Sequence, residues 1–124
     1  MQPNFAFEVE PERNLVRVWL GGFFSPTDAA AFVKERDRVH QHLRCGPNEH
    51  ITLVDIREMA IQPQESVSAF QKILSNPATK SRKLAFVTAR SLARMQIKRA
   101  AASRDAAYFE TVENAERWLF SNEI

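Results

Sequence analysis

The chain has 124 residues, of which 44% are hydrophobic, and it carries a formal net charge of +2 at pH 7. This length predicts a single domain over residues 1–124 with one core, and this composition excludes wholesale disorder. No apolar run approaches the ~20 residues that cross a bilayer, and so small a net charge gives no reason to expect nucleic-acid binding.

Two β-strands and a helix are predicted at the start of the chain. Alternating apolar residues predict the first strand over residues 5–9, and a continuous β-rich run predicts the second over residues 15–20. Because a short turn separates them, the two strands should form an antiparallel hairpin. Ser25 and Pro26 then begin a helix, which should continue to the stop signal at Cys45.

Strands and helices alternate over the rest of the chain. Strands are predicted over residues 50–56, 83–88 and 107–109, and helices from Pro63, from Ser91 and over residues 114–120. The order ββαβαβαβα predicts an α/β fold. Its sheet of about five strands should be mostly parallel, with an antiparallel edge strand and helices on both faces.

The charges are unevenly distributed along the sequence. No acidic residue occurs from Ser66 to Arg104. The basic residues of this stretch are Lys72, Lys80, Arg82, Lys83, Arg90, Arg94, Lys98, Arg99 and Arg104. They form either one basic face that attracts an acidic partner, or a solvated helix face whose charges pair with acidic neighbours in space.

No recognisable catalytic or metal-binding motif occurs in the sequence. Gly21 and Gly22 lack the further glycines of a phosphate-binding loop. Cys45 is placed at a predicted helix C-terminus, where the helix dipole disfavours a thiolate. His40 and His42 are two residues apart on a helix, so they point in different directions, as a solvated pair does. We therefore expect a protein that is not an enzyme and that has no metal and no cofactor.

Asp55 is the most suggestive carboxylate in the sequence. It is predicted at the end of a central strand, and ligands of open α/β sheets collect beyond the carboxyl ends of the strands. An aspartate at such a position has a structural role just as often as it binds a ligand: it then caps a loop or pairs with a neighbouring arginine. Because no base or nucleophile accompanies Asp55, we derive no mechanism from it.

Several features together resemble the STAS-like, SpoIIAA-like family, which includes bacterial anti-sigma-factor antagonists. These features are the element order, the strand ending in Asp55, the loop before Pro63, and the closing pattern of Phe109, Trp118 and Leu119. The resemblance covers almost the whole chain. It implies a non-enzymatic regulatory module that docks on a protein, and with the single cysteine it favours the bacterial cytoplasm.

The phosphorylation switch of the antagonists has no direct equivalent in this sequence. Family members carry an Asp-Ser-Ser-Gly-like motif after the third strand, and phosphorylation of its serine switches partner binding off. Here Gln64 or Glu65 occupies the switch position, and Ser66 follows one residue later. Either Glu65 supplies a permanent phosphate-like charge, or Ser66 and Ser68 are ordinary residues of an amphipathic helix.

The resemblance also implies where a partner protein docks. The surface should comprise the loop over residues 57–62, the helix from Pro63 and the basic helix that follows, and the basic helix favours an acidic partner. The expected partner-binding residues are Arg57, Glu58, Glu65, Ser66, Arg90, Arg94 and Lys98.

The alternative function is binding of a small molecule or lipid, by analogy with the Sec14-like (CRAL-TRIO) proteins that share this fold. The expected pocket would be lined by Phe23, Phe24, Met59 and Ile61. Phe23 and Phe24 are unusually apolar for a loop, so they are also a candidate interface patch. Together with an exposed sheet edge, this patch favours a homodimer.

Overall fold

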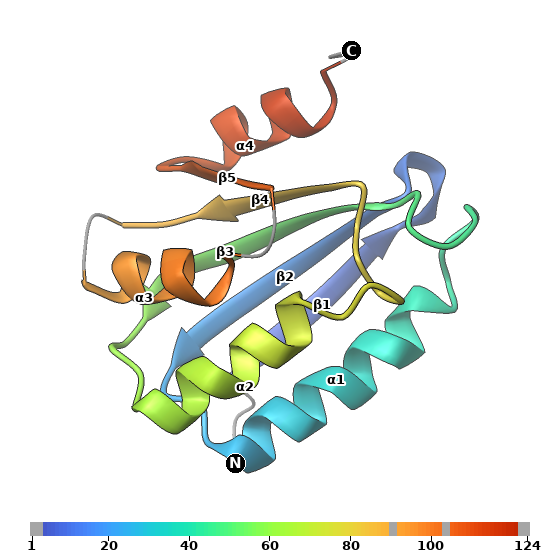
Figure 1. Ribbon diagram of the computed structural model, residues 1–124. Coiled ribbons are helices and arrows are strands. Elements are labelled where there is room, and N and C mark those ends of the chain that lie inside the picture. The colour runs from blue at the N-terminus through green and yellow to red at the C-terminus, as the bar shows by residue number, and fades with distance from the viewer. Residues whose placement is uncertain (1–3, 90–91, 103–104, 122–124) are drawn as a thin grey trace.

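The computed structural model describes residues 4–89, 92–102 and 105–121, which form a mixed five-stranded sheet with helices on both faces (Figure 1). The elements are β1 (Phe5–Glu10), a short 3-10 helix (Pro11–Arg13), β2 (Leu15–Gly22), α1 (Pro26–His40), β3 (Ile51–Met59), α2 (Gln64–Leu74), β4 (Lys83–Val87), α3 (Leu92–Ala100), β5 (Ala106–Phe109) and α4 (Val112–Leu119). The strands lie in sequence order, with β1 antiparallel to β2 and the others parallel. The predicted α/β fold is confirmed.

Helices α1, α2 and α3 cover one face of the sheet (Figure 1). They bury Phe32, Phe70 and Ile97 in one cluster with Val54 and Phe86 of the central strands. Each of these side chains is at most 8% exposed. The cluster forms because apolar residues repeat at helical spacing on the helices and alternate on the strands.

Helix α4 covers the opposite face, where it packs on β3, β4 and β5. Ala115 and Leu119 of α4 contact Leu53, Ala85 and Val87 in a second, smaller cluster. The central strands are therefore buried on both faces, which explains their nearly continuous apolar sequences. No helix in the described part of the chain has the length and apolar character that crossing a membrane requires.

Helix α1 begins where the sequence predicts but ends earlier. The Ser25 hydroxyl accepts from the backbone N–H of Asp28 at 3.1 Å, and the Asp28 carboxylate accepts from that of Ser25 at 2.9 Å, which makes a capping box. The helix ends at His40, because the N–H groups of residues 41–43 bond three residues back instead of four. The expected extension to Cys45 is therefore wrong.

Strand β3 is longer than the sequence predicts. Residues 57–62 were expected to form a loop, but β3 continues to Met59. The cause is pairing with β2, which itself extends through Gly21 and Gly22 to meet Glu58 and Met59. A glycine is required at Gly22, whose φ of 68° lies in the left-handed region that other residues avoid. The loop between β3 and α2 is thus only residues 60–63.

Candidate functional site

The loops and helix starts at the carboxyl end of the parallel strands carry the candidate site. Helices α1, α2 and α3 each follow a parallel strand, so all three begin near this end of the sheet (Figure 1). In open α/β sheets this end is where ligands and partners bind. The segments to consider are the loop over residues 23–25, the loop over residues 60–63 and the first turns of α3.

Gln62 joins the two loops through a buried hydrogen-bond network. Its side chain is 6% exposed. Its Oε1 accepts from the backbone N–H of Phe24 at 2.9 Å, and its Nε2 donates to the carbonyls of Gly22 at 2.8 Å and Ala60 at 2.7 Å. A single amide side chain therefore uses its donor and acceptor groups together to hold the β2–α1 loop against the β3–α2 loop.

Gln96 ties the same loop to α3. The backbone N–H of Gln62 donates to Oε1 of Gln96 at 2.7 Å, and Nε2 of Gln96 donates back to the Gln62 carbonyl at 2.8 Å. The Ser66 hydroxyl, which is 1% exposed, adds a hydrogen bond to the Phe24 carbonyl. Two loops, the start of α2 and the middle of α3 are thus held in one arrangement by paired polar groups.

Three exposed apolar side chains project from this network. Phe23 is 65% exposed, Ile61 53% and Met95 56%. Each is the sequence neighbour of a residue bound in the network: Phe24, Gln62 or Gln96. Their backbones are therefore held firmly while their side chains face solvent, which is an unfavourable place for apolar groups unless something covers them.

Basic residues extend this surface along α3. Met95, Lys98 and Arg99 are spaced three and four residues apart, so they share one exposed face of the helix. Lys98 lies 5.1 Å over the ring of Tyr108, and neither Lys98 nor Arg99 forms an ion pair with any residue in the described ranges. We define the carboxyl-end surface as Phe23, Ile61, Met95, Lys98 and Arg99.

The basic stretch found in the sequence does not gather on one face. Lys83 instead donates to the Trp118 carbonyl at 2.7 Å and to Ser121, so it satisfies carbonyl groups at the end of α4. Lys80 lies in the segment between α2 and β4, at the other end of the sheet. Only part of the stretch is therefore available to attract an acidic partner at the carboxyl-end surface.

Asp55 pairs with a neighbouring arginine, which is one of the two structural roles that the sequence leaves open. Arg57 donates through Nε at 3.0 Å and Nη2 at 2.8 Å, and its backbone N–H adds a bond at 3.1 Å. Burial alone would raise the pKa of Asp55, but these bonds outweigh it and hold that pKa below its ordinary value of 3.8. The carboxylate is thus engaged as a structural ion pair.

This pairing predicts the acid titration of Asp55. We expect Arg57→Gln to raise the Asp55 pKa above its wild-type value. Burial raises this pKa, and the substitution removes the charge of Arg57 and its side-chain hydrogen bonds, which lower it. Since the folded-state pKa is depressed, the pair stabilises the fold above pH ~4, and the gain is lost as pH falls through the folded-state pKa. NMR titration of the Asp55 carboxyl carbon in both proteins measures this, and equal pKa values would contradict it.

The other expected partner-binding residues are spread over several environments. Glu58 accepts from the Trp19 indole at 2.9 Å, and Glu65 is exposed in the first turn of α2. Ser66 is buried, and Arg94 is half-buried on α3. Arg90 lies outside the described residues.

The four residues expected to line a ligand pocket are separated by the fold. Phe24 and Met59 are buried in the main core, at 1% and 7% exposure, whereas Phe23 and Ile61 point to solvent. None of the four lines the cavity described below, which lies near the amino ends of the parallel strands. No group of three or more His, Cys, Asp or Glu side chains in the described ranges is placed to hold a metal ion.

Comparison with known proteins identifies the fold. No protein-family model and no curated protein sequence matches the chain. A solved structure does: an uncharacterised protein of the DUF3478 family with a SpoIIAA-like fold, from Shewanella loihica PV-4, superimposes with a TM-score of 0.71. The match covers 94% of each chain at 15% sequence identity. The chain therefore has a SpoIIAA-like fold, as its sequence predicts.

Proposed function

We propose that the chain is a non-enzymatic protein-interaction module that docks on a partner protein through the carboxyl-end surface. One observation carries this proposal: Phe23, Ile61 and Met95 are exposed on segments that the Gln62 network holds in place. A surface that is already ordered loses little conformational entropy on binding, so its apolar contacts contribute more fully to affinity. Exposed methionine and aromatic side chains are also typical of binding surfaces.

The partner should present apolar side chains together with carboxylates. Lys98 and Arg99 lie one turn from Met95 and form no ion pair with described residues, so an acidic partner segment would complement them.

The absence of catalysis is part of the proposal. The side chains of this surface are apolar or basic, and the nearby Asp55 is engaged by Arg57.

Regulation of this docking should not use Ser66. Its hydroxyl is buried and donates to the Phe24 carbonyl, so a kinase would have to open the fold to reach it. Glu65 is exposed beside it and is the residue that could act as a permanent negative charge. We therefore propose docking that is not switched off by phosphorylation at this position.

The Sec14-like alternative has less support. A lipid carrier needs a deep apolar pocket, and sites for drug-sized ligands reach ~300 Å³ or more. The residues expected to line such a pocket are divided between the core and the surface. The cavity near the amino ends of the parallel strands has a volume of only about 70 Å³. A larger hollow of about 400 Å³, beside Trp118 of α4, is more open to solvent and is not lined by any of the expected residues.

Replacing two apolar residues of the surface should weaken partner binding strongly. We expect Ile61→Asp/Met95→Asp to weaken binding at least ~10-fold, because apolar residues at the centre of an interface commonly contribute more than ~1 kcal/mol each. The measurement is quantitative mass spectrometry of proteins captured from a lysate of the source organism, followed by calorimetry with the purified partner. Because both residues are exposed, the free energy of unfolding should change little.

Phe120→Asp is the matched control. Phe120 is also an exposed apolar side chain, at 36%, but it follows α4 on the other face of the sheet. Loss of the partner in Phe120→Asp as well, or retention in the double variant, would contradict the proposed surface. Sedimentation velocity of the purified chain distinguishes a different protein from a second copy: a dimer that the double variant dissociates would make the partner the chain itself.

A further inference from the structure

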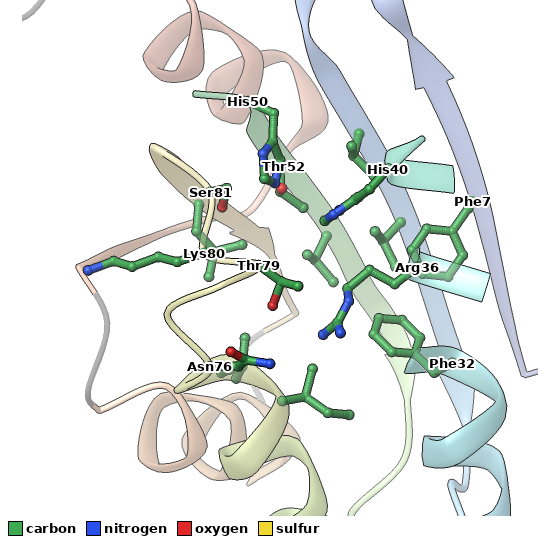
Figure 2. A pocket seen from close by; sticks show the side chains of 16 residues that line it. Phe7, Phe32, Arg36, His40, His50, Thr52, Asn76, Thr79, Lys80 and Ser81 are labelled. Atoms are coloured by element: carbon green, nitrogen blue, oxygen red, sulfur yellow. The ribbon is translucent and has the colours of Figure 1, made fainter. Parts of the chain in front are cut away.

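A small cavity lies at the other end of the sheet from the carboxyl-end surface (Figure 2). Its volume is about 70 Å³, and it lies between α1, the end of α2 and the sheet. Apolar side chains, among them Phe7, Phe32 and Val54, form much of its lining. The segment between α2 and β4 closes its other side with polar residues such as Asn76 and Thr79.

The titratable side chains that line this cavity are all basic. Arg36, His40, His50 and Lys80 contribute, and no carboxylate from the described part of the chain lines it. Figure 2 shows the Arg36 guanidinium and the His40 ring directed into the cavity, whereas the Lys80 ammonium extends away from it. Arg36 and His40 are therefore the groups that a bound anion would meet.

Arg36 is a largely, but not fully, buried cation whose charge is only partly neutralised. Its side chain is 11% exposed. Asp37 accepts from its Nε at 3.3 Å and its Nη2 at 3.0 Å, but the Asp37 side chain is 57% exposed, so water screens that pair. Within the described ranges Nη1 has no hydrogen-bond partner. A carboxylate inside the cavity would accept a hydrogen bond from Nη1 of Arg36.

His40 provides a second donor beside Arg36. Its ring lies 4.6 Å from that of His50, measured between ring centroids. Burial, with help from the charge of Arg36, lowers the pKa of His40, and Asp37 only partly opposes this. A negative charge in the cavity would act in the opposite sense and favour the protonated imidazole. The polar side chains of Asn76 and Thr79 lie across the cavity from Arg36 (Figure 2).

The surroundings favour a single negative charge over a double one. Helices α1 and α2 both end at this cavity, at His40 and Leu74, and the carbonyl groups of helix C-termini carry partial negative charge. A phosphate dianion would be repelled by these ends and would find no helix N-terminus to bind it. The small volume and apolar lining admit a short hydrocarbon chain.

We infer that this cavity binds a short-chain aliphatic monocarboxylate, with its carboxylate on Arg36 and His40 and its hydrocarbon part against the apolar lining. Binding of this kind is independent of the proposed protein docking, because the two sites lie at opposite ends of the sheet and share no residue. The chain would then sense a small organic acid at one end and contact its partner at the other.

Calorimetry and NMR with butyrate test this inference. We expect butyrate to bind and to shift the ring resonances of His40. We expect Arg36→Gln to weaken binding about tenfold or more, which is the size expected for loss of a charge-assisted hydrogen bond. Arg38→Gln is the matched control: Arg38 lies on the same helix, is exposed and pairs with Glu35, so binding should not change.

Four further measurements keep the test decisive: one Arg36 variant, two other ligands and the double variant of the docking surface. Arg36→Lys keeps the positive charge but loses the planar guanidinium that binds a carboxylate through two hydrogen bonds. It should therefore bind butyrate more tightly than Arg36→Gln and more weakly than the wild type, and it gives a second measurement if Arg36→Gln folds poorly. Tighter binding of inorganic phosphate than of butyrate, or equal binding of 1-butanol, would overturn the proposed ligand class, and no butyrate binding would overturn the site. Ile61→Asp/Met95→Asp should bind butyrate normally, so failure of this inference is distinguishable from failure of the docking proposal.

Discussion

We expect Phe24→Ala to lower the free energy of unfolding by about 3–5 kcal/mol, the usual cost of removing a fully buried aromatic side chain. Phe24 is 1% exposed, and its ring lies 5.2 Å from that of Phe70 and 6.1 Å from that of Phe5. The substitution therefore removes apolar burial and two aromatic contacts, and it leaves a cavity between β1 and α2. Urea denaturation followed by circular dichroism measures the effect.

Phe23→Ala is the control for this prediction. The two phenylalanines are adjacent in the sequence, but Phe23 is 65% exposed. Its replacement should change the free energy of unfolding by less than about 0.5 kcal/mol, while weakening partner binding. Equal destabilisation by both substitutions would contradict the assignment of Phe24 to the core and Phe23 to the docking surface.

The second large effect is expected at Gln62. Gln62→Ala should lower the free energy of unfolding by about 2–3 kcal/mol, because the buried Phe24 N–H loses its acceptor and the Ala60 carbonyl loses its Gln62 donor, while the Gly22 carbonyl keeps only its bond from the Ala60 N–H. It should also weaken partner binding, since the segments that carry Phe23 and Ile61 would lose their common support. Chemical denaturation and the calorimetric binding assay measure the two effects.

Two variants show whether the Gln62 effect comes from its hydrogen bonds. Gln64→Ala, at an exposed position at the start of α2, should stay within about 0.5 kcal/mol of the wild type. Gln62→Glu keeps the shape but loses the donors, so at neutral pH its carboxylate would face the Gly22 and Ala60 carbonyls. It should therefore be destabilised at neutral pH and partly recover in acid. A stable Gln62→Ala would mean that water replaces the network at little cost.

Local pattern was enough to predict the order of the elements. The alternation of apolar residues in β1, the continuous apolar run of β3 and the capping residues Ser25 and Asp28 are all properties of short segments. The Asp55–Arg57 pair lies within the same strand, so it too could be anticipated from neighbouring residues. For this reason the α/β fold and its SpoIIAA-like resemblance followed from the sequence.

The end of β3 could not be predicted in this way. Arg57 and Glu58 are charged, and residues of this kind between an apolar strand and a proline are typical of a loop. They are nevertheless in the strand, because Gly21 and Gly22 of β2 extend alongside and pair with Glu58 and Met59. Strand pairing between distant segments therefore overrode the local preference.

The residues that matter most at the two sites have no sequence signal of their own. In the sequence Gln62 has no feature that distinguishes it from an ordinary loop residue. Its hydrogen-bond partners nevertheless include Phe24, Gln96 and Gly22, which lie 34 to 40 positions away. His40 was expected to be solvated with His42, but the fold sets it half-buried against His50, which is 4% exposed.

The sequence by itself determined the elements, their order and the apolar faces that join them, because periodicity and capping act over a few residues. Only the tertiary structure decided which of Phe23 and Phe24 is buried, that Gln62 joins two loops, and that Arg36 and His40 share a cavity. The physical reason is that burial and polar pairing depend on which segments meet across the sheet, and that is set by the packing of the whole chain.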